Sequence, residues 1–267
     1  MSARDLARSF DDVAAAYERG RPRYEPHVIA AIGEAAVGPR LLDVGAGTGR
    51  LSGPLLQAGY DMVAVEPLDA MRAILASNIG PERALAGRAE ALPLDDASVD
   101  GAVCSDAWHW FDGARAADEL HRVVRPGGGV VLCISQVRWI EEGNAPAWAR
   151  ETNALLDTLW QATDHPYIGG SRRPDGLEGH PGFEPIEVRY VPFVHHTDRD
   201  GMLAHYTSMS ALASLPPGRR GEVLAELDAI LARHGIDDAD VPYRAELWVT
   251  RRRPGQAPPA GHPAAAS

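Results

Sequence analysis

Lysine is absent from this chain of 267 residues, so all 26 residues counted as lysine plus arginine are arginine. A lysine side chain is needed to form a Schiff base, to bind phosphate in a P-loop, or to complete the Tyr/Lys pair of short-chain dehydrogenases. The absence excludes these three kinds of chemistry.

Cysteine is nearly absent as well. Cys104 and Cys133 each lie within an apolar, strand-like run, which favours buried, unreactive thiols over a disulfide framework. Five histidines recur between residues 165 and 205, but their spacing matches no dense ligand pattern. We therefore expect no metal ion.

Long apolar runs and a basic surface are also missing. No stretch reaches the ~20 consecutive apolar residues of a membrane span, and the first residues lack the apolar core of a signal peptide. The net charge of −11 offers no basic face to a phosphate backbone. We expect a cytoplasmic protein that binds neither membranes nor nucleic acid.

What the chain does contain is an alternation of strand-like and helix-like segments. Alternation of this kind is typical of an α/β fold with a parallel sheet and helices on both faces. Ligands of such sheets bind at the carboxyl ends of the strands. The predicted strands in this part of the chain are residues 40–44, 61–65, 83–87, 99–105 and 129–135.

The pattern changes after residue 135. We predict a helix over residues 144–163 with Asn144 as its N-cap, and a helix around residues 223–231 that Gly235 ends. Two further strands are predicted over residues 186–194 and 244–249. The Pro/Ala/Gly-rich tail over residues 254–267 is predicted to be disordered.

The stretch "LLDVGAGTGR" (41–50) predicts a ligand site. A strand that ends near Asp43, a turn of Gly45, Ala46 and Gly47, and a following helix place backbone amides beside a ligand. The dinucleotide fingerprint would need a third glycine where Arg50 stands. Glu66 closes the second strand, where an acid can accept both ribose hydroxyls of an adenosine. The alternatives are an ordinary tight turn and a solvated strand end.

These segments resemble a known family. Together with "GRAEALPLDDASVD", "AWHWFD" and "HRVVRPGGG", the glycine turn is similar to the class I S-adenosylmethionine-dependent methyltransferases, in the type 11 small-molecule subgroup. The resemblance implies a Rossmann-like, seven-stranded, mostly parallel sheet over residues 1–253. It also implies an N-terminal helical lid over residues 1–30 and a substrate-covering insertion after the fifth strand, over residues 137–183.

The resemblance also implies how S-adenosylmethionine is bound. The implied contacts are Asp43 to the methionine amino group, backbone at the glycine turn to the aminoacyl part, and Glu66 to the ribose. The lid is expected to cap the carboxylate, although it can equally pack without touching anything reactive. The cofactor-binding residues predicted in this way are Tyr17, Arg21, Asp43, Gly45, Ala46, Gly47, Glu66, Pro67, Ala89, Glu90 and Ser105.

The acceptor side is less defined. His109 is predicted as the general base because its imidazole titrates near neutral pH, although a histidine at a helix entry can also be structural. Trp110, Trp139 and His195 are predicted to line a pocket for an apolar or aromatic small molecule. The protein is expected to be a monomer or a homodimer. Two alternatives stay open: a nicotinamide-dependent oxidoreductase, and a module that binds S-adenosylmethionine without catalysis.

Overall fold

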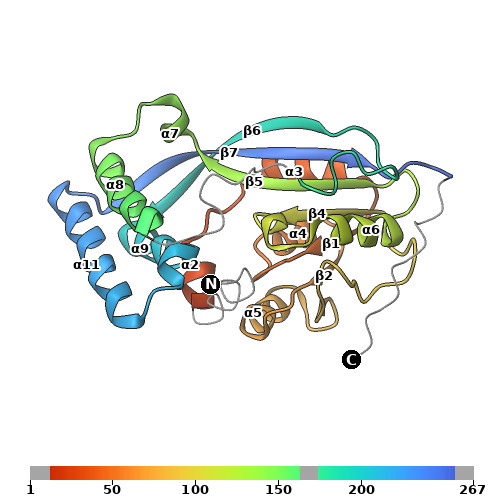
Figure 1. Cartoon of the computed structure of the whole chain (residues 1–267), viewed down its shortest axis with the longest axis horizontal. Helices are drawn as coiled ribbons and strands as arrows, with labels where there is room; N and C mark the ends of the chain where they lie inside the picture. Colours follow the sequence, from red (N-terminus) through yellow and green to blue (C-terminus); the bar gives the residue numbers. More distant parts are fainter. Residues whose placement is uncertain (1–12, 163–173, 256–267) are drawn as a thin grey trace.

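The computed structural model describes residues 13–162 and 174–255 (Figure 1). Seven strands form one sheet in the order β3-β2-β1-β4-β5-β7-β6. Strands β3, β2, β1, β4 and β5 pair in parallel, whereas β7 is antiparallel to both of its neighbours. The strands are β1 (Arg40–Val44), β2 (Asp61–Val65), β3 (Ala84–Leu85), β4 (Gly101–Ser105), β5 (Gly129–Val137), β6 (Glu187–Asp198) and β7 (Asp238–Arg251). The predicted seven-stranded, mostly parallel sheet is confirmed.

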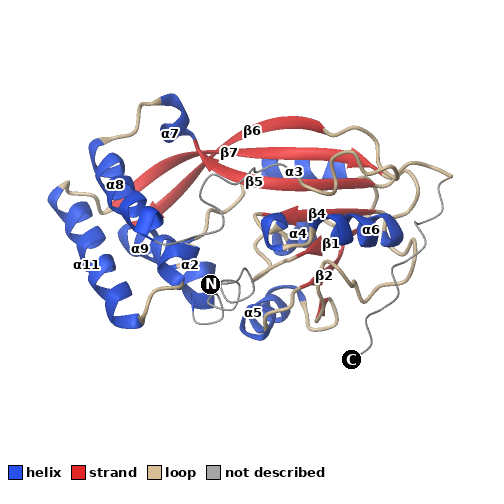
Figure 2. Cartoon of the chain, in the orientation of Figure 1, coloured by secondary structure: helices blue, strands red, loops and turns tan. Residues whose placement is uncertain are grey.

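Helices cover both faces of this sheet, as Figure 2 shows. Successive residues of β1 point to opposite faces, so Leu41 packs in the core cluster under α3 and α4, and Leu42 packs in the cluster under α6. The helices are α2 (Ala14–Gly20), α3 (Pro26–Ala36), α4 (Ser52–Gln57), α5 (Asp69–Ile79), the 3-10 helix η2 (Trp108–Trp110), α6 (Gly113–Val123), α7 (Arg138–Glu142), α8 (Ala147–Ala162), α9 (Arg199–Thr207), α10 (Ser210–Ala213) and α11 (Pro217–Arg233).

A second group of helices lies beyond one end of the sheet. Helices α8, α9, α10 and α11 share their own buried cluster, which includes Leu156, Met202, Tyr206 and Leu227. The long strands β6 and β7 reach from the sheet to this group (Figure 1). No helix in the described ranges is both long and apolar enough to span a bilayer.

Several predicted boundaries are wrong. Strand β3 has only two residues, and β6 and β7 are longer than predicted because they pair with each other from Glu187–Val249 to Asp198–Asp238. At the end of β6 the residues His195, His196, Thr197 and Asp198 are polar and carry no strand pattern, whereas β7 buries Val241 and Tyr243 on one face there. Helix α8 begins at Ala147. Asn144 does not cap this helix, because its side-chain amide donates a hydrogen bond to Glu142 instead.

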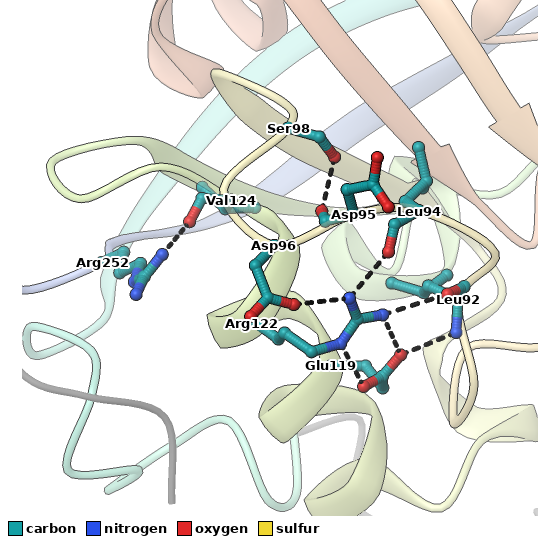
Figure 3. Close-up of polar contacts among 9 residues, drawn as sticks. All are labelled: Leu92, Leu94, Asp95, Asp96, Ser98, Glu119, Arg122, Val124 and Arg252. Atoms are coloured by element: carbon teal, nitrogen blue, oxygen red, sulfur yellow. Dashed lines mark hydrogen bonds and ion pairs between the residues drawn. The ribbon is translucent and has the colours of Figure 1, made fainter.

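Figure 3 shows how the loop between β3 and β4 is fixed. The Arg122 guanidinium, on α6, donates to the carbonyl oxygens of Leu92 (3.0 Å) and Leu94 (2.7 Å). It also donates to both carboxylate oxygens of Glu119, at 2.8 and 2.7 Å. This network holds in place the loop that carries Ala89, and so positions one wall of the site at the carboxyl edge of the sheet.

The predicted disordered tail and part of the predicted insertion lie outside the described residues. Of the tail only residues 254 and 255 are described, and residues 163–173 of the insertion are not. The free thiols of Cys104 and Cys133 are both buried, as predicted. Burial raises the pKa of each thiol well above its usual value.

Candidate active site

The glycine turn stands at the carboxyl end of β1. Gly45, Gly47 and Gly49 all have positive φ angles (68°, 58° and 89°), a conformation that side chains with a Cβ rarely adopt. The amides of Gly45 and Ala46 donate to the carbonyl oxygen of Val65 at 2.9 and 3.2 Å. The turn is therefore hydrogen-bonded to the end of β2, where Glu66 follows.

Glu66 points back towards the turn. Its side chain accepts hydrogen bonds from the Gly47 amide (2.8 Å) and the Leu68 amide (2.9 Å), and the residue is only 5% exposed. These two amides fix the orientation of the carboxylate. A carboxylate has about four lone-pair sites, so one held in this way can still accept from a diol.

Asp43 lies beneath the turn and is 1% exposed. Its carboxylate accepts a hydrogen bond from the Ser52 hydroxyl at 2.5 Å. Burial, together with the neighbouring charge of Glu66, raises the pKa of Asp43 to about 7, against the opposing effect of the Ser52 hydrogen bonds. No arginine or histidine in the described part of the chain forms an ion pair with it. This acid therefore suits a cationic ligand group.

Helix α2 covers the turn. The Tyr17 ring lies over Gly47: a Cβ built on that glycine would be 3.7 Å from Tyr17 Cε1. The Arg21 guanidinium lies over the Tyr17 ring and donates to the Ser208 hydroxyl (3.0 Å) at the end of α9. The guanidinium of Arg50, directly after the turn, donates to the carbonyl oxygens of Glu18 and Arg21. Arg50 thus fastens the lid to the turn, at the position where a dinucleotide fingerprint would have glycine.

The other predicted cofactor residues lie around the same edge. Ser105 ends β4 and hydrogen-bonds to the Tyr24 hydroxyl at 2.7 Å. Ala89 is buried, and Glu90 accepts from the Asp112 amide at 2.9 Å. Pro67 is exposed directly after Glu66. The structure therefore brings the predicted set together at the carboxyl ends of β1, β2 and β4 and along α2; the contacts of each residue with a cofactor stay predictions.

The predicted acceptor residues are divided between two places. His109 is exposed on η2, with its ring beside Trp110, and Trp110 packs with the apolar cluster between α2 and α5. Trp139 and His195 instead line a pocket between α2, α8, α9 and the far ends of β5, β6 and β7. The role of His109 as general base stays a prediction.

This pocket encloses about 710 Å³, part of it open to solvent. Trp148, His205, Tyr206 and Tyr243 also line it. These residues come from α8, α9 and β7 and share no motif in the sequence, so their convergence could not be read from it. Gly20, on the lid, forms part of the wall.

The pocket lies close to the glycine turn. Tyr17, which covers Gly47, and Gly20, which lines the pocket, are three residues apart on α2, or about 4.5 Å along the helix axis. Burial lowers the pKa of His205 in the pocket, and the positive charges of Arg21 and Arg50 contribute to this lowering. The two sites are therefore adjacent along the lid.

Comparisons with known proteins show which family the chain resembles. A family model described as a methyltransferase domain matches residues 42–132. An uncharacterised methyltransferase of Mycobacterium tuberculosis is 43% identical over 233 residues, which cover 87% of this chain and 89% of the relative. The malonyl-[acyl-carrier protein] O-methyltransferase of Pectobacterium atrosepticum is 35% identical and aligns with 78% of this chain and 75% of its own length.

A solved structure supports the same assignment. A putative type II methyltransferase from Anaeromyxobacter dehalogenans superposes with a TM-score of 0.58 at 26% identity, covering 87% of this chain and 97% of that one. The fold and the glycine turn define a class I methyltransferase. The chain belongs to this family, which confirms the resemblance drawn from its motifs.

Proposed function

We propose that this methyltransferase uses S-adenosylmethionine and transfers its methyl group to a small-molecule acceptor. The observation that carries the proposal is the position of Glu66, whose carboxylate is held against the glycine turn by the amides of Gly47 and Leu68.

The residues present fit this cofactor. Glu66 offers a fixed carboxylate to the ribose hydroxyls, and charge-assisted hydrogen bonds of this kind are among the strong ones. Asp43 offers a buried carboxylate to the methionine ammonium, and the bare backbone of Gly47 leaves room for the aminoacyl part. S-adenosylmethionine supplies a methyl group on a sulfonium, an already activated electrophile.

The protein's own part is to bind, orient and exclude water. Because the Tyr17 ring lies over Gly47, a ligand that occupies that face requires the ring to turn aside. The ring can then close again over the ligand, held by α2 and by Arg50. The lid therefore serves both as an entry gate and as a barrier to solvent.

Calorimetric titration tests the proposal. S-adenosylmethionine and S-adenosylhomocysteine should both bind, and Glu66→Gln should weaken binding by about 1.5–3 kcal/mol, or roughly 10- to 150-fold. Glu187→Gln, on the exposed edge strand β6, is the matched control and should leave affinity unchanged. A folded protein that binds NAD and neither sulfur compound would refute the proposal in favour of the oxidoreductase alternative.

Catalysis is tested separately. Formation of S-adenosylhomocysteine in the presence of a panel of acceptors distinguishes an enzyme from a module that only binds. Binding without turnover across a broad panel would favour the second.

A further inference from the structure

The residues that line the pocket next to the lid limit the kinds of acceptor molecule that it can bind. Among the described residues that line it, none is Asp, Glu, Lys or Arg. A formal charge on a bound molecule would therefore have no directly opposed ionic partner in the wall, and burying an unpaired charge is costly. The molecule that fits this wall enters uncharged.

The apolar part of the wall is flat and aromatic. Trp139 and Trp148 meet edge to face, with ring centroids 5.6 Å apart and an interplanar angle of 87°. Tyr206 and Tyr243 add two further ring surfaces. Aromatic walls of this kind bury a planar apolar body with large contact area.

The polar part of the wall is dominated by two imidazoles. His195 comes from β6 and His205 from α9, and both line the pocket. His195 Nε2 and His205 Nδ1 are buried and have no hydrogen-bond partner among the described residues. A buried polar atom without a partner is costly, and a bound ligand is one way to supply the partner.

Both imidazoles are neutral at physiological pH. Burial and, to a smaller extent, nearby arginines lower the pKa of His195 to about 4 and that of His205 to about 3. Arg50 acts on both rings, Arg21 on His205 and Arg23 on His195, while a hydrogen bond to the Gly20 backbone partly opposes this for His205. A neutral imidazole has one nitrogen that accepts a hydrogen bond.

We propose that the pocket binds a planar, hydroxylated apolar molecule, such as a phenol or an enol, and that the buried imidazole nitrogens of His195 and His205 are the acceptors for the hydrogen bond of its hydroxyl group. The proposal rests on the proposed function, since it names the acceptor class of the same methyl transfer. The hydroxyl oxygen forms the new bond to the methyl carbon, and its proton passes to solvent water at the open side of the pocket. The electron pair of the broken carbon–sulfur bond stays on sulfur.

The positive charges of the arginines around the lid favour one kind of acceptor group over another. A hydroxyl that loses its proton gains negative charge, and the positive charges of Arg21 and Arg50 stabilise that charge. The same field opposes a protonated amine. The pocket therefore selects a hydroxyl acceptor over an amine acceptor.

The test uses 4-nitrophenol as a probe and 4-nitroanisole, its methyl ether, as the comparison, measured by equilibrium dialysis and absorbance without any cofactor. We expect 4-nitrophenol to bind at least about tenfold more tightly than 4-nitroanisole, the ratio that one hydrogen bond of about 1.4 kcal/mol gives. The absorbance titration of bound 4-nitrophenol should shift to higher pH than that of the free compound, because burial also raises the pKa of the Tyr206 and Tyr243 phenols in the same wall.

Two variants are used, one on β6 and one on α9, so that a folding defect in one of them does not decide the result. His195→Gln and His205→Gln should each reduce the preference for 4-nitrophenol, with thermal unfolding as the check on folding. His196→Gln is the matched control, because His196 is exposed and paired with Asp240 at 2.8 Å; it should behave as the wild type. Equal binding of the two compounds, no binding of either, or an unchanged preference in both variants would overturn the proposal. Because the titration involves no S-adenosylmethionine, these outcomes leave the proposed function to be judged by its own experiment.

Discussion

Gly20 is the position at which the lid is most sensitive to a single methyl group. A Cβ at Gly20 would lie 2.0 Å from the backbone nitrogen of His205 and 2.4 Å from the carbonyl carbon of Ala204. Gly20 is helical and has no positive φ, so Gly20→Ala introduces no backbone strain. Its whole effect is steric, between α2 and the backbone of α9.

The size of the effect follows from the overlap. Non-bonded heavy atoms rest about 3.5 Å apart, so α2 must move away from α9 by roughly 1.5 Å. Overpacking of this kind costs about 1–3 kcal/mol, which lowers Tm by about 2–12 °C in a protein of this size. If the lid undocks instead of shifting, its own docking free energy limits the loss of stability.

Urea unfolding and limited trypsin digestion measure both outcomes. Arg19 lies in α2 and Arg23 lies just beyond it, so a displaced lid should be cleaved faster at these two residues. Gly221→Ala is the matched control, because Gly221 lies within helix α11 with no atom within 4 Å of a new Cβ. It should stabilise the protein by about 0.5–1 kcal/mol. A Gly20→Ala protein as stable and as resistant to trypsin as Gly221→Ala would refute the reasoning.

Three further predictions concern the parts that hold the site. Arg122→Ala should lower the free energy of unfolding by about 2–4 kcal/mol in urea titrations, since it removes bonds to two carbonyls and to Glu119; a loss below about 0.5 kcal/mol would contradict this. Because burial raises the pKa of Asp43 to about 7, the folded state binds a proton that the unfolded state has lost between about pH 4 and 7. Its contribution to stability therefore falls as pH rises through that window, by about 4 kcal/mol at most, and Asp43→Asn should flatten the decline between about pH 4 and pH 7. Arg50→Met removes the hydrogen bonds to the Glu18 and Arg21 carbonyls, so tryptic cleavage in α2 should quicken; an unchanged cleavage rate would show that these two bonds do not hold the lid.

The half of the molecule that is predicted best from the sequence is the half built from local backbone geometry. The turn of Gly45, Ala46 and Gly47 needs positive φ angles at both glycines, and Glu66 follows the next strand in register with it. The glycine turn and the acid after the next strand lie close together in the sequence, so together they form a pattern that can be recognised in it. The sheet, the turn and the position of Glu66 were all predictable on that basis.

The acceptor half leaves no such pattern. Trp139, Trp148, His195, His205 and Tyr243 come from five different elements and meet only because β6 and β7 extend beyond the sheet to α8 and α9. The end of β6 in this extension is polar and carries no strand signal, although the extension turns His195, Val241 and Tyr243 towards the pocket. His205 has no sequence feature that separates it from the other histidines; its environment alone marks it.

This division has a physical consequence for how the enzyme can change specificity. The proposed cofactor side is built from main-chain geometry at the glycine turn and from two buried carboxylates, Asp43 and Glu66. The acceptor side is fixed by side chains on elements that pack in a separate cluster, so their identities can change without disturbing the sheet. Helix α2 contacts both sides, because Tyr17 covers Gly47 while Gly20 borders the acceptor pocket. Movement of this one helix therefore couples the two sites, and substitutions in it should alter cofactor affinity and acceptor affinity together, whereas substitutions in α8 or β6 should alter acceptor affinity alone.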